Sequence, residues 1–178
     1  MAALTAGVVA PDFSLPLLNP ASATEAPTAG ADGARFSLAG SLLRGPVVLA
    51  FFKGSCPVCQ YALPFLERLH QAYRGKDVSV VGVSQDSRRD TAAFARQFGI
   101  GFPVALDDTA KYPVSNAYGL TNVPTLFYIA PGGEIEISSV GWVKAEVAAI
   151  NARIAEALKG GAATIFKPGE QVADWRPG

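Results

Sequence analysis

Hydrophobic runs of strand length alternate along the chain with stretches whose apolar residues recur at helical spacing. Two of these runs, at residues 47–52 and 78–83, are almost wholly apolar and predict strands buried on both faces of a sheet. Two later runs, at residues 125–129 and 135–140, flank Pro131-Gly132-Gly133 and predict an antiparallel hairpin. A buried sheet with both parallel and antiparallel parts is therefore expected.

Helical patterns fill the gaps between the predicted strands. The longest begins at the Cys56–Cys59 segment and carries apolar residues at helical spacing, with Pro64 inside the helix as an expected kink. Three more helices are predicted at residues 87–98, 111–118 and 144–159, and one short strand at residues 102–106. This order predicts an α/β domain in which a mixed sheet carries helices on both faces.

The two ends of the chain have a different character. Residues 1–18 are predicted to be extended, with a short edge strand at 13–15 that pairs with residues 36–38 as an N-terminal hairpin. Residues 19–34 between them are almost free of bulky apolar side chains and predict a mobile surface loop. The tail of residues 160–178 is marked by Gly and Pro, and its aromatic residues either pack onto the body or contact a partner. We expect residues 1–178 to form a single domain.

Composition narrows the range of functions. The chain has 178 residues, of which 49% are hydrophobic, and 15 basic residues balance 15 acidic ones. A nucleic-acid-binding protein needs a basic face, so this balance argues against one. The longest unbroken apolar run, residues 47–52, is far shorter than the roughly 20 residues of a membrane helix. No basic residue precedes Arg35, so no secretory leader is visible, and a cytoplasmic location is expected.

The chain contains two cysteines, and they form the motif Cys56-Pro57-Val58-Cys59. A structural zinc site needs four ligands, and the single histidine, His70, leaves that set incomplete. Covalent haem attachment needs a histidine after the second cysteine, where Gln60 stands. A redox-active dithiol needs no further ligand, so no metal or cofactor is expected. His70 itself is expected to be a solvated residue in the middle of the helix.

The position of the motif, between a buried strand and a helix, predicts which cysteine reacts. With Cys56 as the N-cap, Pro57 occupies the first helical position, where its missing N–H costs nothing. The amides of Val58 and Cys59 then point at the Cys56 sulfur from the positive end of the helix dipole, which favours the thiolate. Cys56 is the predicted nucleophile and Cys59 the resolving thiol. The alternative is an inert disulfide or a pair of buried thiols.

A family resemblance follows from these residues and others farther along the chain. The segment from Phe51 to Cys59, Pro64 in the helix and Val123-Pro124-Thr125 before a strand resemble the thioredoxin superfamily. The segments Ala10–Leu15 and Val80–Ser87 resemble its redoxin branch, the AhpC/TSA-like group that joins peroxiredoxins to thioredoxin-like reductases. The resemblance covers about residues 8–158 and implies a thioredoxin fold with an N-terminal hairpin extension.

The resemblance also implies a place for the substrate. Pro124 corresponds to the cis-proline of the superfamily, which packs against the active-site cysteines. It would turn the backbone N–H and C=O of Val123 toward the dithiol, so that a substrate segment adds there as a short strand. Val123, Pro124 and Pro57 are therefore the predicted substrate-binding residues. An ordinary turn before a strand is the alternative reading of Pro124.

Some positions depart from the family patterns. Ala50 stands where thioredoxin carries an acidic residue, and Ala62 stands where the cytochrome-maturation reductases carry one, so no base for Cys59 is identified. Ser55 stands where thioredoxin has a tryptophan. Lys53 is predicted to favour the Cys56 thiolate electrostatically, and a solvated lysine is the alternative. Peroxiredoxins carry a threonine and a proline where this chain has Lys53 and Leu49.

The sequence thus predicts a thiol–disulfide oxidoreductase that acts on a protein or small-molecule disulfide. A separate thiol donor, such as a thioredoxin or glutathione system, would reduce the dithiol again. A peroxiredoxin-like thiol peroxidase, with Cys56 peroxidatic and Cys59 resolving, is one alternative, and peroxide would then be the substrate. A non-catalytic binding module on the same fold is the other.

Overall fold

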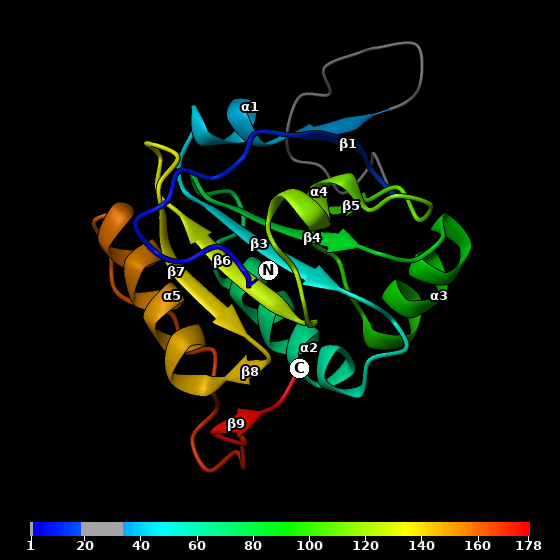
Figure 1. Cartoon of the computed structure of the whole chain (residues 1–178). Coiled ribbons are helices and arrows are strands. Elements are labelled where there is room, and N and C mark those ends of the chain that lie inside the picture. The colour runs from blue at the N-terminus through cyan, green and yellow to red at the C-terminus, as the bar shows by residue number, and fades with distance from the viewer. Residues whose placement is uncertain (1, 19–33) are drawn as a thin grey trace.

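The computed structural model describes residues 2–18 and 34–178, and a five-stranded mixed sheet lies at its centre (Figure 1). The strand order across the sheet is β5-β4-β3-β6-β7. Strands β3, β4 and β5 run parallel, whereas β6 is antiparallel to β3 and β7 is antiparallel to β6. Their bounds are Val47–Phe52 for β3, Ser79–Ser84 for β4, Val104–Leu106 for β5, Thr125–Ile129 for β6 and Ile135–Val140 for β7.

The central strand β3 shows why continuous apolar runs become buried strands. All of its six residues are buried. Because neighbouring side chains point to opposite faces, Val48, Ala50 and Phe52 join one core and the residues between them join the other. The predicted hairpin is confirmed as β6 and β7, and the second apolar run is confirmed as β4, one residue later than predicted.

Helices cover both faces of the sheet, as predicted (Figure 1). One core holds buried residues of α2 (Pro57–Ala72), α3 (Arg88–Phe98) and α5 (Lys144–Ala157). The core on the other face holds residues of α1 (Leu38–Leu42), α4 (Pro113–Ala117) and the N-terminal segment. The predicted thioredoxin fold, a central sheet between helices, is confirmed.

The N-terminal hairpin is present. Strand β1 (Ser14–Pro16) pairs antiparallel with β2 (Arg35–Ser37), and Leu15 lies opposite Phe36. Leu38 was predicted to continue the second strand, which is wrong. The Ser37 hydroxyl accepts a hydrogen bond from the Gly40 amide at 3.2 Å and begins helix α1 there. The predicted loop of residues 19–34 lies outside the described residues, apart from Ala34.

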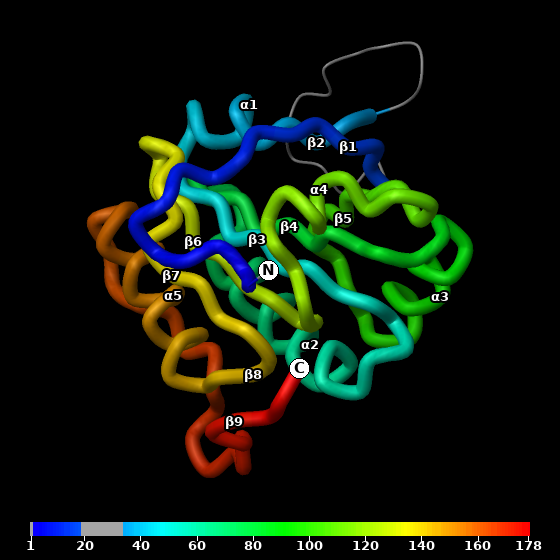
Figure 2. Tube along the Cα trace, viewed as in Figure 1, coloured from blue at the N-terminus to red at the C-terminus, as the bar shows by residue number. Residues whose placement is uncertain are grey.

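The tail packs onto the body of the domain. Ile165 is buried, and the Phe166 ring contacts the rings of Phe65 and Trp142. Farther along, β9 (Trp175–Arg176) pairs antiparallel with β8 (Trp142–Val143). Figure 2 shows the chain passing behind α5 and turning below β8 to end close to the start of α2. Of the two readings of the tail aromatics, packing holds for Phe166, whereas Trp175 remains 63% exposed.

Candidate active site

The dithiol lies where β3 leaves the sheet and α2 begins. Cys56 is the N-cap of α2, with an extended backbone (φ −82°, ψ 117°), and Pro57 occupies the first turn. The Cys59 amide donates a hydrogen bond to the Cys56 sulfur over 3.3 Å. The N-cap geometry predicted for Cys56 is therefore present, because a helix start leaves amides without partners inside the helix.

A loop distant in sequence completes the surroundings of Cys56. The Val123–Pro124 peptide bond is cis, as the resemblance implied. The Val123 carbonyl oxygen lies 3.2 Å from the Cys56 sulfur and accepts a hydrogen bond from its thiol. The Gly141 amide holds the loop from the other side by donating to the Pro124 carbonyl at 2.8 Å. The fold thus brings the predicted residues Cys56, Val123 and Pro124 together.

The two thiols have different environments. Cys56 is half-buried, whereas Cys59 has no exposed surface and belongs to the core between β3 and α2. Burial raises the pKa of the Cys59 thiol, and the nearby Cys56 and Asp86 raise it further, against a backbone hydrogen bond from Lys53 that lowers it. Only the Cys56 sulfur is placed to meet a substrate from solvent.

Lys53 contributes to the site through its backbone. Its carbonyl oxygen accepts a hydrogen bond from the Cys56 amide at 3.1 Å. This bond holds the loop that leads from β3 into the motif. The electrostatic effect of the Lys53 side chain on Cys56 stays a prediction.

Two side chains that the sequence motifs did not predict position this loop. An Asp86 carboxylate oxygen accepts a hydrogen bond from the Gly54 amide at 2.6 Å, and the Gln60 side-chain amide donates to the Gly54 carbonyl at 2.8 Å. Asp86 follows β4, the parallel neighbour of β3, so the two strand ends meet at one edge of the sheet. Its place after a buried strand was the signal that could have identified it.

The positions that depart from the family patterns are buried hydrophobic sites. Ala50 and Ala62 lie in the core around Cys59, so no carboxylate reaches Cys59 from either position. Leu49 is buried in the core on the opposite face of β3 from α2 and cannot contact a substrate at Cys56. Pro57 and Ser55 are exposed beside the dithiol.

Comparison with known proteins places the chain in a family. The model of the AhpC/TSA family matches residues 6–138, which is well over half of the chain. The chain belongs to the AhpC/TSA family. The redoxin resemblance is confirmed by this match.

Curated relatives of this AhpC/TSA-family chain include thiol-disulfide oxidoreductases named ResA. The protein from Bacillus thuringiensis is 31% identical over 102 residues, which cover 56% of this chain and 57% of the relative. The protein from Geobacillus thermodenitrificans is 30% identical over 95 residues, covering 52% and 53% of the two chains. The chain therefore spans about half the length of the curated relatives it matches.

Solved structures share the fold of this AhpC/TSA-family chain over most of its length. A candidate protein disulfide isomerase from Bacteroides thetaiotaomicron has a TM-score of 0.73 at 25% identity and covers 90% of this chain and 96% of its own. A candidate thiol:disulfide interchange protein DsbE from Chlorobium tepidum has a TM-score of 0.70 at 27% identity, with 87% and 99% covered.

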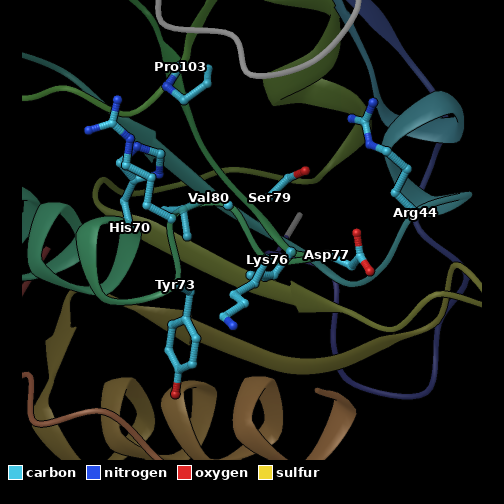
Figure 3. Close-up of a pocket in the computed structure, with 11 residues that line it drawn as sticks. Arg44, His70, Tyr73, Lys76, Asp77, Ser79, Val80 and Pro103 are labelled. Carbon is cyan, nitrogen blue, oxygen red and sulfur yellow. The ribbon is translucent and has the colours of Figure 1, made fainter. Parts of the chain in front are cut away.

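Other features of this AhpC/TSA-family chain lie away from the dithiol. A cavity of about 200 Å³ opens near the end of α2, where the side chains of Arg44, Lys76 and Asp77 point in different directions instead of converging (Figure 3). His70, also at this cavity, is not the solvated residue expected: its ring contacts Phe102, and burial lowers its pKa.

Within residues 2–18 and 34–178, no group of three or more metal-ligating side chains gathers. No helix in those residues is long and apolar enough to cross a bilayer.

Proposed function

We propose that the chain is a thiol–disulfide oxidoreductase with Cys56 as nucleophile and Cys59 as resolving thiol. One observation carries the proposal: the half-buried Cys56 sulfur caps α2 within hydrogen-bond distance of the Cys59 amide and of the Val123 carbonyl oxygen. The first group stabilises negative charge on the sulfur, and the second marks where a substrate backbone would lie. The names of the ResA relatives support the same activity.

The first step is attack on a disulfide. The Cys56 thiolate attacks one sulfur of the substrate disulfide, so that a bond forms between Cys56 and the substrate while the substrate's own S–S bond breaks. The leaving sulfur departs as a thiolate and takes a proton from solvent. The backbone of Val123 holds the substrate segment as a short strand, with Pro124 and the exposed Pro57 shaping its surroundings.

The second step releases the substrate. Cys59 loses its proton and attacks the Cys56 sulfur, which breaks the mixed disulfide and leaves a Cys56–Cys59 bond. The substrate gains two electrons and the dithiol loses two. A separate thiol donor of the thioredoxin or glutathione type then reduces the dithiol again. We propose that the protein acts in this reducing direction in the cytoplasm, where thiol donors keep cysteine pairs reduced.

Trapping of the mixed disulfide tests the assignment. With Cys59→Ser the second step is blocked, so substrates accumulate on Cys56 as mixed disulfides. These appear as higher-mass species that disappear when dithiothreitol reduces them. With Cys56→Ser no such species forms, because the remaining thiol has no exposed surface. Equal trapping by both variants would show that the roles of the two cysteines are wrong.

The match to the AhpC/TSA family favours one alternative, a thiol peroxidase. There the Cys56 thiolate attacks a peroxide oxygen, giving a sulfenic acid and releasing an alcohol or water. Cys59 then condenses with the sulfenic acid, forming the disulfide and a water molecule. Insulin reduction and thiol-dependent peroxide loss, measured side by side, separate the two activities. Inactivity in both assays would favour a non-catalytic binding module.

A further inference from the structure

The segment of residues 173–178 docks onto the elements that surround the dithiol. The Ala173 amide donates a hydrogen bond to the Tyr61 hydroxyl on α2 at 2.9 Å. The Ala173 carbonyl accepts one from the Trp142 indole at 2.6 Å, just before the β8–β9 pairing begins. The segment is therefore held to both α2 and β8.

The same segment reaches the loop that carries Val123. The Asn122 side-chain amide donates to the Gly178 carbonyl oxygen over 3.1 Å. A Cβ placed on Gly178 would lie 3.0 Å from the Val123 carbonyl oxygen, the same oxygen that accepts from the Cys56 thiol. Figure 2 shows the end of this segment close to α2. The segment therefore borders the position at which a substrate strand would pair with Val123.

Arg176 places a positive charge at this border. Its guanidinium lies over the Tyr61 ring, 3.8 Å from the centroid. Tyr61 lies in the second turn of α2, five positions after Cys56. Arg176 is exposed and, within the described part of the chain, forms no ion pair with a carboxylate. Stacking on a ring fixes the orientation of a guanidinium without neutralising its charge. The N–H groups at the edge of the guanidinium stay available as hydrogen-bond donors.

We propose that residues 175–178 form one wall of the substrate site and that Arg176 binds a carboxylate near the substrate's disulfide. The inference rests on the proposed function, since it concerns which disulfides reach Cys56. The favoured substrates are peptides or small compounds that carry an acidic group within a few residues of the disulfide. A planar guanidinium suits a carboxylate because the two can form paired hydrogen bonds.

The test measures a ratio of rates in the full chain. Two synthetic peptides share the same disulfide and differ only in having Glu or Gln near the cysteine. We expect the wild-type chain to reduce the Glu peptide with a kcat/KM about two- to fivefold higher at low salt, as for an exposed ion pair. Added salt should reduce this ratio, because screening weakens such pairs. In Arg176→Gln the ratio should fall to about one, and Arg176→Lys should keep part of it.

Arg74→Gln is the matched control, because Arg74 is an exposed cation at the opposite end of α2, and this variant should keep the wild-type ratio. If Arg176→Gln keeps the wild-type ratio, Arg176 does not bind the substrate carboxylate and the inference is wrong. If the wild-type chain reduces the two peptides equally well, the inference fails while the proposed function stands. If it reduces neither peptide, the proposed function fails and the inference fails with it.

Discussion

Gly141 offers the sharpest test of how the 173–178 segment is held. This residue joins β7 to β8 with φ +78°, a conformation that costs an L-residue roughly 1–2 kcal/mol. A Cβ at this position would lie 2.6 Å from the Arg176 carbonyl oxygen and 2.8 Å from the Gly178 amide nitrogen, both of them backbone atoms. In Gly141→Ala the segment must therefore move away from the Val123 loop.

The cost follows from the contacts that are lost. Besides the backbone strain, the displaced segment loses hydrogen bonds worth about 1 kcal/mol each, among them the Asn122–Gly178 bond and part of the β8–β9 pairing. We expect the free energy of unfolding to fall by roughly 2–4 kcal/mol in total. At the usual sensitivity to urea, the unfolding midpoint drops by about 1 M.

Urea unfolding and the peptide assay check the prediction together. Gly141→Ala should lose the preference for the Glu peptide although Arg176 is unchanged, because the guanidinium no longer lies over Tyr61. Gly132→Ala is the matched control, since nothing lies within 4 Å of a Cβ there. If Gly141→Ala is as stable as Gly132→Ala and keeps the preference, the docking of the segment plays no part in substrate selection.

Three further predictions concern the dithiol and its loop. At pH 7 a small alkylating agent should label Cys56 and leave Cys59 unmodified, as peptide mass mapping can show, because burial removes Cys59 from solvent and raises its pKa. For the same reason the release of substrate from Cys56 should become faster as the pH rises, since more Cys59 ionises; a pH-independent release rate would contradict this. Asp86→Ala removes the carboxylate that holds the Gly54 amide, and we expect it to destabilise the fold by roughly 1–3 kcal/mol. It should also shift the release step to lower pH, because the Asp86 charge raises the Cys59 pKa; unchanged stability and pH profile would assign Asp86 no role.

Local patterns determined much of the fold. The apolar run at residues 47–52 gives strand β3 with the predicted bounds, because an unbroken run of this length is stable only where both faces are covered. The N-cap at Cys56 also follows from neighbouring residues, since Pro57 suits the first turn of a helix. The cis bond before Pro124 was predicted from the family resemblance and not from the residues alone.

Other features depend on residues far apart in the sequence, and only the tertiary structure decided them. Strands β8 and β9 have two residues each, too few for a periodic pattern, and they form because the tail returns to α2. The bond between Asp86 and Gly54 arises because β3 and β4 end at one edge of the sheet. A sequence pattern indicates which face of an element is apolar, but it does not indicate which distant backbone segment will lie beside that element. The Cys56–Cys59 motif could therefore be identified from the sequence, whereas the position of residues 175–178 beside it could be seen only in the folded chain.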